Sequence, residues 1–412
     1  METVRKIVEL MLEKGTYGGD FMARLPDGRP VFAPFGIPGE TAKIEFADSD
    51  KRFLKGRIVE VIQASPERLT PRCIHFGECG GCHYQHMSYE KQLELKQQIV
   101  AEQLERIGGF RGIEVKPVVP SPSPWNYRNN VQFAVDDQGR LGFQRMGSHA
   151  ILPIRECHLP NDRINGIWQQ LEFEAGSGID TVTLRQSSDG EDLLILEGDG
   201  RMLPELESEL SLSIVHRSDL GEILMAGENM LNMEALDRSF HVSAGSFFQV
   251  NTEQAESLGR GGLEKASVGP GSGGVDGYCG VGLFSAFLTP KVKRLIGIEV
   301  SESACADFAV NLDEFDNVEL YVGAAEDILP ELKLEPDVIL VDPPRAGLDA
   351  AVRKALIDSN ARQIIYISCD PSTLARDLKE LVSGGYEIEL VQPFDMFPQT
   401  FHVETLVALY LT

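Results

Sequence analysis

The chain has 412 residues, of which 42% are apolar, and a formal net charge of −25. This composition supplies a full hydrophobic core over roughly two or three domains, and without a membrane span or signal-peptide core we expect a cytoplasmic protein with no membrane partner. The acidity argues against general polyanion binding, although residues 125–155 hold four arginines against two acids, which leaves a local nucleic-acid face open.

Residues 1–64 alternate short apolar runs with Gly and Pro turns, as in GTYGGDFMARLPDGRP. Four or five strands at this spacing predict a small β-barrel. A Pro-containing linker follows, and a strongly periodic stretch predicts a helix over about residues 88–107. Residues 126–240 alternate strand-like segments such as NNVQFAVDD and DLLILEGD, which predicts a mostly antiparallel region. We therefore expect a first domain over residues 1–64 and a second over residues 65–240.

Strand-like and helix-like segments alternate from about residue 246, which predicts a parallel, doubly wound sheet in a third domain, residues 241–412. In YISCDPSTLARDL, residues 366–378, the strand ends before Cys369, Pro371 stops it and Ser372 is expected to cap a helix. A cysteine is more often a buried structural thiol. This one, however, stands at a strand-to-helix turn, where open α/β sheets place their ligands.

The stretch VDGYCGVGLFSAFL, residues 275–288, reads as a strand that runs through a glycine turn into a helix. Gly280 and Gly282 allow a backbone to approach a nucleotide-like ligand closely, although the three-glycine dinucleotide pattern is incomplete. A second strand ends in Glu299, where a carboxylate can bind both ribose hydroxyls. The pattern suits S-adenosylmethionine as well as NAD, and a purely structural glycine turn is the alternative.

Two further acids stand on apolar strands near the C-terminal end. Asp342 closes the strand of VILVDPPRAGLD, and two prolines fix the loop that carries Arg345. Glu404 lies in FHVETLVALYL. Taken alone, Glu404 is best interpreted as a water-facing residue of an edge strand. Beside a nucleophile, it becomes a candidate general base with a raised pKa.

Three cysteines follow Cys-x5-Cys-x2-Cys spacing, and a fourth comes much later; the set is Cys73, Cys79, Cys82 and Cys157. Four thiolates can hold zinc or an iron–sulfur cluster, and the thiolate count does not decide between them. Scattered free thiols are an unconvincing alternative at this spacing.

The segments GSFFQVN, DGYCGVG, DPPRAGL, SCDPSTLARD and HVETLVAL occur in the order found in the RNA (uracil-5-)-methyltransferase family, which the chain resembles over nearly its whole length. The resemblance implies formation of 5-methyluridine in RNA with S-adenosylmethionine, on a Rossmann-like catalytic domain. The N-terminal barrel resembles the OB-like, RNA-binding TRAM domain. The four cysteines match the ligands of members that hold a [4Fe-4S] cluster, which we expect to brace the RNA-binding face.

The resemblance also implies roles for single residues. Cys369 would be the nucleophile that attacks C6 of uracil, and Glu404 the base that removes the C5 proton. Six further residues would bind the S-adenosylmethionine: Gln249, Tyr278, Gly280, Gly282, Glu299 and Asp342. Phe247 and Arg345 would contact the uracil. Two positions depart from the family pattern, since Gly277 replaces a bulkier residue and Asp370 stands where many members have Asn.

The RNA substrate remains open at this stage. Members with both barrel and cluster resemble the ribosomal enzymes most, so 23S rRNA is our expectation and tRNA the alternative. A methyltransferase for another base or for protein would leave Cys369 and Glu404 without a role. A non-catalytic RNA-binding or assembly protein would leave every catalytic segment unexplained. We expect a monomer.

Overall fold

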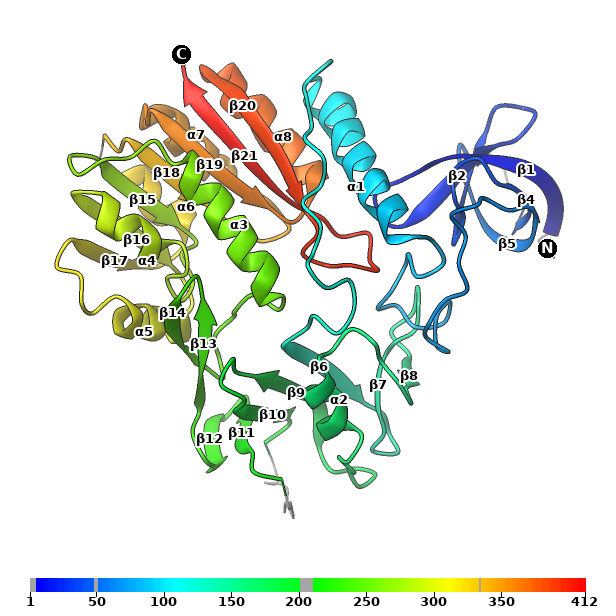
Figure 1. The fold of residues 1–412 in the computed structure, drawn as a ribbon, viewed down its shortest axis with the longest axis horizontal. Coiled ribbons are helices and arrows are strands. Elements are labelled where there is room, and N and C mark those ends of the chain that lie inside the picture. Colours follow the sequence, from blue (N-terminus) through cyan, green and yellow to red (C-terminus); the bar gives the residue numbers. More distant parts are fainter. Residues whose placement is uncertain (1–4, 48–50, 201–209, 333–334) are drawn as a thin grey trace.

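The computed structural model describes residues 5–47, 51–200, 210–332 and 335–412 (Figure 1). Its N-terminal part is a closed barrel with strand order β1-β2-β3-β5-β4. The strands are β1 (Arg5–Gly15), β2 (Asp20–Arg24), β3 (Pro30–Pro34), β4 (Thr41–Ala47) and β5 (Leu54–Gln63). The prediction of a barrel of four or five strands is confirmed, and residues 1–4 and 48–50 of the predicted range lie outside the described part of the chain. Along β4 buried residues alternate with more exposed ones, as a strand with one face in the barrel core requires.

Helix α1 (Tyr89–Gln103) continues into the π-helical turn η1 (Leu104–Gly108) and confirms the predicted helix. Ser88 caps it, because its Oγ accepts a hydrogen bond from the Lys91 N–H at 3.2 Å. The helix lies between the barrel and the C-terminal sheet (Figure 1). Leu95 packs in the barrel core and Val100 packs in the core of the C-terminal sheet, so one helix joins two hydrophobic cores.

The central region is built on a seven-stranded sheet of order β12-β11-β10-β9-β6-β7-β8. Only β10 and β11 run parallel, which agrees with the predicted antiparallel character. The elements are β6 (Asn130–Val135), β7 (Leu141–Gln144), β8 (Ile151–Pro153), α2 (Asp162–Trp168), β9 (Ile179–Gln186), β10 (Asp192–Gly198), β11 (Ser213–Ser218), β12 (Gly221–Ala226), and the separate hairpin β13 (Met230–Ala235) and β14 (Arg238–Ser243).

The C-terminal sheet has the order β17-β16-β15-β18-β19-β21-β20, and its first five strands are parallel. Its elements are α3 (Thr252–Lys265), β15 (Gly273–Gly277), α4 (Ser285–Leu288), η2 (Thr289–Lys291), β16 (Arg294–Glu299), α5 (Glu302–Asn311), β17 (Val318–Val322), α6 (Ala325–Ile328), η3 (Leu329–Glu331), β18 (Val338–Val341), α7 (Ala350–Asp358), β19 (Gln363–Ser368), α8 (Pro371–Ser383), β20 (Tyr386–Phe394) and β21 (Glu404–Leu411). The doubly wound sheet is as predicted. One difference matters for the site: β21 runs antiparallel between β19 and β20 instead of lying at the edge.

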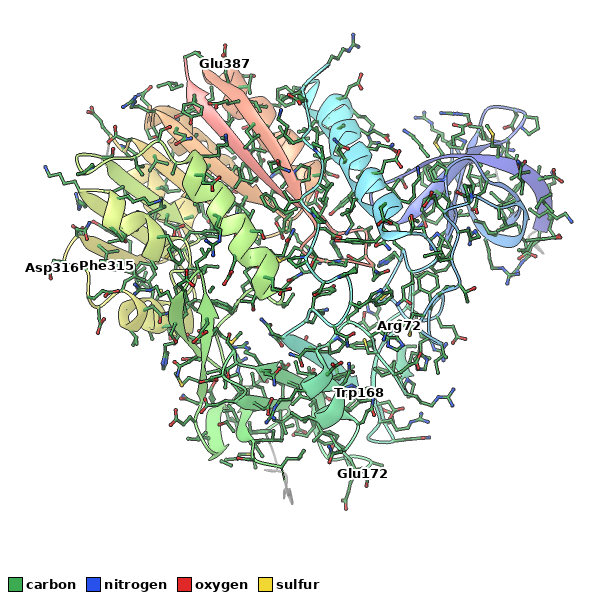
Figure 2. The ribbon with its side chains drawn as sticks, viewed as in Figure 1. Arg72, Trp168, Glu172, Phe315, Asp316 and Glu387 are labelled. Carbon is green, nitrogen blue, oxygen red and sulfur yellow. The ribbon has the colours of Figure 1, made fainter. Side chains whose placement is uncertain are left out.

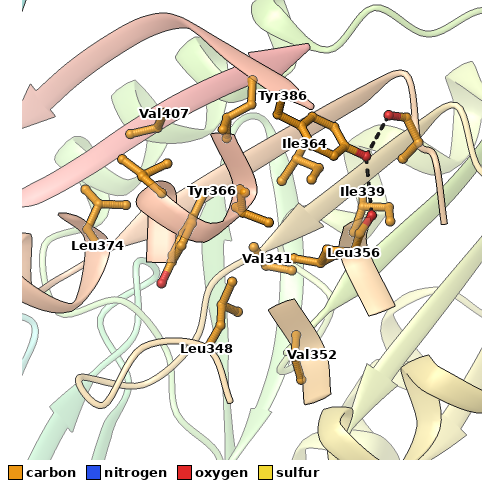
Figure 3. Packing of buried hydrophobic residues seen from close by; sticks show 14 of the residues in the cluster. Ile339, Val341, Leu348, Val352, Leu356, Ile364, Tyr366, Leu374, Tyr386 and Val407 are labelled. Atoms are coloured by element: carbon orange, nitrogen blue, oxygen red, sulfur yellow. Dashed lines mark hydrogen bonds between the residues drawn. The ribbon is translucent and has the colours of Figure 1, made fainter. Parts of the chain in front are cut away.

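The core beneath the C-terminal sheet is formed by apolar side chains from its strands and from α7 and α8 (Figure 3). Tyr366 and Tyr386 are the polar members, and each hydroxyl has a partner. The Tyr386 hydroxyl, for example, donates to the carbonyl oxygens of Ala361 at 2.9 Å and Leu356 at 3.3 Å. Within the part of the chain that the structure describes, no helix is long and apolar enough to cross a membrane.

The loop between β20 and β21, residues 395–403, is held by helix α1 through fully buried polar groups. The Lys96 ammonium lies 2.5 Å from an Asp395 carboxylate oxygen and donates to the Phe397 carbonyl at 3.1 Å. One turn away, Gln92 and Gln399 exchange hydrogen bonds at 3.0 Å, with Gln399 donating from its backbone and accepting at its side chain. The segment that leads into β21 is therefore fixed by side chains that lie 299 and 307 residues earlier in the chain.

Replacing Lys96 tests how much this contact stabilises the fold. Lys96→Met leaves the Asp395 carboxylate buried without its cation, so we expect the free energy of unfolding to fall by about 3–5 kcal/mol. Urea unfolding followed by tryptophan fluorescence measures it, because both tryptophans, Trp125 and Trp168, lie in the central region. The double variant Lys96→Met/Asp395→Asn should recover most of the loss.

The matched control is Lys354→Met, which removes an exposed lysine that pairs with Asp358 one helical turn away. An exposed pair of this kind contributes roughly 0–1 kcal/mol, so this variant should unfold close to the wild type. Equal losses for the two lysine variants would contradict the structural role of the Lys96–Asp395 pair.

Candidate active site

The turn after β19 presents Cys369 at the carboxyl edge of the C-terminal sheet. The next residue, Asp370, is the N-cap of α8, because its Oδ1 accepts from the N–H groups of Ser372 at 2.8 Å and Thr373 at 3.0 Å. The expectation that Ser372 caps this helix was therefore wrong. Pro371 occupies the first helical position, where its missing N–H costs nothing, and this moves the cap back to Asp370.

The Cys369 thiol is half-buried among carboxylates. Burial and, after it, the charges of Glu404 and Asp342 together raise its pKa to about 12, and the Arg345 guanidinium opposes this rise. A raised pKa favours the protonated thiol in the free protein. If Cys369 acts as a nucleophile, its thiol therefore needs a proton acceptor as it attacks.

Glu404 is the first residue of β21 and is only 8% exposed. Its Oε2 has no hydrogen-bond partner among the residues that the structure describes. The edge-strand interpretation was wrong, since β19 and β20 flank β21 on both sides. Burial raises the pKa of Glu404 to about 8, helped by the charge of Asp342 and opposed by Arg345. A buried, unpartnered carboxylate with a pKa near neutrality can serve as a proton acceptor.

A second buried acid extends this group beyond the residues predicted from sequence. Asp276, in the middle of β15, accepts from the Ser285 hydroxyl at 2.6 Å through one oxygen, and its other oxygen has no partner in the described residues. Burial raises the pKa of both Asp276 and Asp342 to about 7, and each also feels a neighbouring acid. Asp276 could have been predicted from sequence by the same signal that identified Glu404, an acidic residue inside an apolar strand. Buried carboxylates collected at one edge of the sheet suit a ligand that carries positive charge.

The loop 342–348 is fastened to the first turns of α8, directly behind the cysteine turn. Thr373 donates through its hydroxyl to the Arg345 carbonyl at 3.2 Å, and Arg376 donates to the Ala346 carbonyl at 2.9 Å. Asp377 accepts from the Leu348 N–H at 2.8 Å. The Arg345 side chain remains exposed and acts on both Cys369 and Glu404. The structure therefore brings Cys369, Glu404, Asp342 and Arg345 together.

The glycine turn follows β15 and lies beside the end of β16, at the same carboxyl edge of the sheet. Gly280 has φ of 55° and open space where a Cβ would stand, whereas a Cβ on Gly282 would meet Leu312 at 2.4 Å. Glu299 accepts from the Gly280 N–H at 2.9 Å and from the Ser301 N–H at 2.8 Å, which fixes its carboxylate against the turn. Tyr278 lies in the same turn with φ of 66°. Gly277 pairs with Val341 and Ile298 in register, so the substitution noted there leaves the strand end intact.

Two exposed apolar residues at this edge of the sheet were not predicted from sequence. Val300 follows Glu299 and is 64% exposed, and Glu299 pairs across the sheet with Val322, which is 61% exposed. Exposed apolar side chains at the ends of adjacent strands suit a flat, apolar ligand group such as a base. The sequence offered no signal for this, because exposure is visible only in the fold.

The loop between β14 and α3 carries Phe247 and Gln249. Phe247 is 67% exposed, unlike its buried neighbour Phe248. The hydroxyls of Ser246 and Ser303 lie 2.6 Å apart, which ties this loop to the start of α5, just after Glu299. Gln249 is half-buried, and its carbonyl accepts from the Asn129 side chain at 3.1 Å. The loop thus places an exposed aromatic ring in a segment that is tied to the start of α5, close to Glu299.

The four cysteines predicted as ligands lie apart from these residues, around one cavity of about 280 Å³; they are Cys73, Cys79, Cys82 and Cys157. Burial raises the pKa of all four thiols, that of Cys157 to about 11. Among the described residues, no group of three or more Cys, His, Asp or Glu side chains is arranged to hold a metal ion. Arg72 stacks over Trp125 at 5.4 Å beside this region (Figure 2).

Comparison with known proteins agrees with this geometry. The family described as tRNA (Uracil-5-)-methyltransferase matches residues 199–411, and the TRAM domain matches residues 2–59. An uncharacterized RNA methyltransferase of Halalkalibacterium halodurans is 36% identical over 98% of this chain and 97% of its own length. One from Synechocystis is 33% identical over 98% of this chain and 95% of its own length.

A solved structure extends the similarity to the fold of nearly the whole chain. The tRNA (uracil-54, C5)-methyltransferase of Pyrococcus abyssi, crystallised with S-adenosyl-L-homocysteine, superimposes with a TM-score of 0.75 and 26% identity, over 98% of this chain and all of its own. Sequence match, coverage and fold lead to one conclusion. The chain belongs to the RNA (uracil-5-)-methyltransferase family with a TRAM domain, and it is an RNA methyltransferase that uses S-adenosylmethionine.

Proposed function

We propose that this enzyme methylates C5 of one uridine in 23S rRNA, with Cys369 as the nucleophile and Glu404 as the base. The observation that carries the chemistry is the pairing of a half-buried thiol with a buried, unpartnered carboxylate at one edge of the sheet. The choice of 23S rRNA is supported by the barrel combined with four cysteines around one cavity. tRNA is the second candidate, favoured by the Pyrococcus abyssi structure, which is that of a tRNA enzyme.

The chemistry follows from the weak nucleophilicity of C5. As the Cys369 sulfur attacks C6, its proton passes to a neighbouring carboxylate, and an enolate forms with electron density at C5. S-adenosylmethionine, when bound, supplies the methyl group. Glu404 then removes the C5 proton, the C5–C6 double bond re-forms and the Cys369 thiolate leaves. The exposed ring of Phe247 would stack on the extruded uracil, which offsets part of the cost of unstacking it.

The remaining predicted residues would hold the methyl donor. Glu299 would bind the ribose, and the glycine turn with Gly280 would lie against the ligand backbone. Asp276 and Asp342 would face its positive charge. Tyr278 and Gln249 would complete the crevice, and Arg345 would contact the uracil or its phosphate. The unpartnered oxygen of Asp276 and the open space at Gly280 support this fit.

The four cysteines would hold a [4Fe-4S] cluster. All four thiols line one cavity, which supports this assignment, and a single zinc ion held by the same four thiolates is the alternative. When bound, the cluster would act as a covalent brace. Cys82 precedes His83 and Tyr84, whose N–H groups both donate to the Gln399 carbonyl at 2.8 and 3.0 Å. The brace would therefore support the loop that leads to Glu404.

The distribution of charge supports RNA contact at the barrel. Residues 1–64 hold ten basic and ten acidic residues, so the entire net charge of −25 lies in residues 65–412. Since affinity for phosphates depends on basic residues, the barrel is the part of the chain that repels RNA least. We keep the division into residues 1–64, 65–240 and 241–412 as the proposed RNA-binding, central and catalytic domains.

Substrate identity is tested by competition between RNAs. Anaerobically purified protein is given labelled S-adenosylmethionine with unmodified 23S rRNA and tRNA together. We expect 5-methyluridine in the digested 23S rRNA and none with Cys369→Ala. Label confined to tRNA would overturn the substrate assignment. Absence of 5-methyluridine from both RNAs, with folded and cofactor-replete protein, would overturn the proposed reaction.

Glu404→Gln tests the assignment of the base. Because the pKa of Glu404 is about 8, the wild-type rate should rise with pH and be about 100-fold below its plateau at pH 6. Loss of the base should slow product release roughly 10²- to 10⁴-fold and leave RNA attached through Cys369, visible as a slowly migrating band on a denaturing gel. Normal turnover by the variant would contradict the assignment.

The same carboxyl group also gives a stability signature. The pKa of Glu404 is higher in the folded than in the unfolded chain, so the folded state keeps a proton that the unfolded state loses above about pH 4.5. The stability that this group contributes is lost as pH rises from about 4.5 to about 8. The melting temperature of the wild type should therefore fall relative to Glu404→Gln across that range.

Cys79→Ala tests the cluster. We expect four iron and four sulfide ions per wild-type chain, roughly, a loss of both in the variant, and weaker RNA binding or lower thermal stability. The matched control is Cys305→Ala, a buried cysteine outside the cavity. Zinc without sulfide in the wild type would contradict the cluster, and intact RNA binding with lost catalysis would contradict its bracing role.

A further inference from the structure

A side chain of the barrel reaches the turn that carries the proposed nucleophile. Tyr17 lies in the turn between β1 and β2, and its hydroxyl donates to Oδ2 of Asp370 at 2.9 Å across 353 positions of sequence. The other carboxylate oxygen of Asp370 caps α8. Asp370 is therefore held on both sides, by the helix that follows Cys369 and by the barrel.

The rest of this barrel turn is fitted against the approach to Glu404. The Tyr17 ring meets Phe401 edge-on at 5.6 Å, and Phe401 packs at 4.2 Å against His402, two residues before Glu404. Gly19 has φ of 89°, and a Cβ there would stand 3.1 Å from His83 and 3.3 Å from Phe401. The β1–β2 turn thus packs between the turn that carries Cys369 and the segment that leads to Glu404.

The Tyr17 hydroxyl, unlike the Tyr17 ring, affects the electrostatic field at the Cys369 sulfur. After burial and the charges of Glu404 and Asp342, with Arg345 opposing, the Asp370 carboxylate is a further cause of the raised pKa of Cys369. Burial and Asp370 raise the pKa of the Tyr17 hydroxyl, which keeps it a proton donor. A donor on Asp370 weakens the field of that carboxylate at the neighbouring sulfur. If Tyr17 served only to dock the barrel, its ring on Phe401 would be enough.

We propose that Tyr17 is a positioning residue for Cys369, acting through its hydrogen bond to Asp370, so that the RNA-binding barrel completes the turn of the nucleophile. The inference rests on the proposed role of Cys369. The proposed role of Tyr17 differs from a general docking role in one respect. Removal of the Tyr17 hydroxyl alone changes the reactivity of the Cys369 thiol and catalysis, and it does so only while residue 370 carries a charge.

The test measures the reactivity of Cys369 in the folded enzyme without RNA. Iodoacetamide labels the full-length protein at pH 8.0–9.0, and mass spectrometry follows the tryptic peptide 363–376, in which Cys369 is the only cysteine. Tyr17→Phe should slow labelling of Cys369 at least two-fold at each pH. Tyr410→Phe is the matched control, because it removes a hydroxyl bonded to Gln363 at the far end of β21, and it should label at the wild-type rate.

The double variant separates the proposal from simple loosening of the turn. In the Asp370→Asn background, Tyr17→Phe should change the labelling rate less than two-fold. An effect below two-fold in the wild-type background, faster labelling, or an equal effect in both backgrounds would overturn the proposal. With a methyl-accepting RNA, Tyr17→Phe should also lower kcat several-fold and leave the KM for RNA within two-fold.

The two proposals can fail independently. If the wild type forms no 5-methyluridine while the labelling result holds, the proposed function fails and the Tyr17 contact stands. If 5-methyluridine forms but the labelling rates do not differ, the function stands and the role of Tyr17 is overturned.

Discussion

The buried contact between helix α1 and the loop 395–403 is the constraint on which the site depends. The Lys96–Asp395 ion pair and the Gln92–Gln399 exchange leave this loop one position, and Glu404 follows it directly. A buried ion pair contributes little net stability against an apolar replacement, but it strongly disfavours any arrangement that separates its members. The Lys96–Asp395 pair therefore acts here mainly by fixing a position. It holds the loop before β21, the strand that carries the proposed base, against helix α1, which packs in two hydrophobic cores.

The candidate active site concentrates charge of one sign. Asp276, Asp342 and Glu404 all have raised pKa values because burial disfavours their ionised forms. The charge of Asp276 also raises the pKa of Asp342, and the charge of Asp342 raises that of Glu404. Such a group destabilises the empty protein at neutral pH. In the proposed function, a cationic methyl donor would lower that cost when it binds, so the carboxylates that destabilise the protein without it would favour its binding. Arg345, at the rim, is the cation of the protein itself that acts on Cys369 and Glu404.

Local signals predicted much of this architecture. The barrel, helix α1, the doubly wound sheet and the catalytic segments follow from periodicity and from patterns within about fifteen residues. The antiparallel, internal placement of β21 does not, because an apolar strand pairs equally well at an edge. The Asp370 cap was within reach, since Asp before Pro is a common helix start. The Tyr17–Asp370 contact was not, because no rule of local sequence joins residues 353 positions apart.

The uneven charge of the chain explains why a contact between the barrel and the turn of Cys369 matters. All of the net charge of −25 lies in residues 65–412, so RNA is repelled least at the neutral barrel. A neutral base extruded from its strand can approach the buried carboxylates more easily than the charged backbone can. An enzyme arranged in this way would benefit if the barrel also supported the turn that carries Cys369, the proposed nucleophile. Tyr17 supplies that link, because one hydrogen bond joins the barrel to the residue beside Cys369.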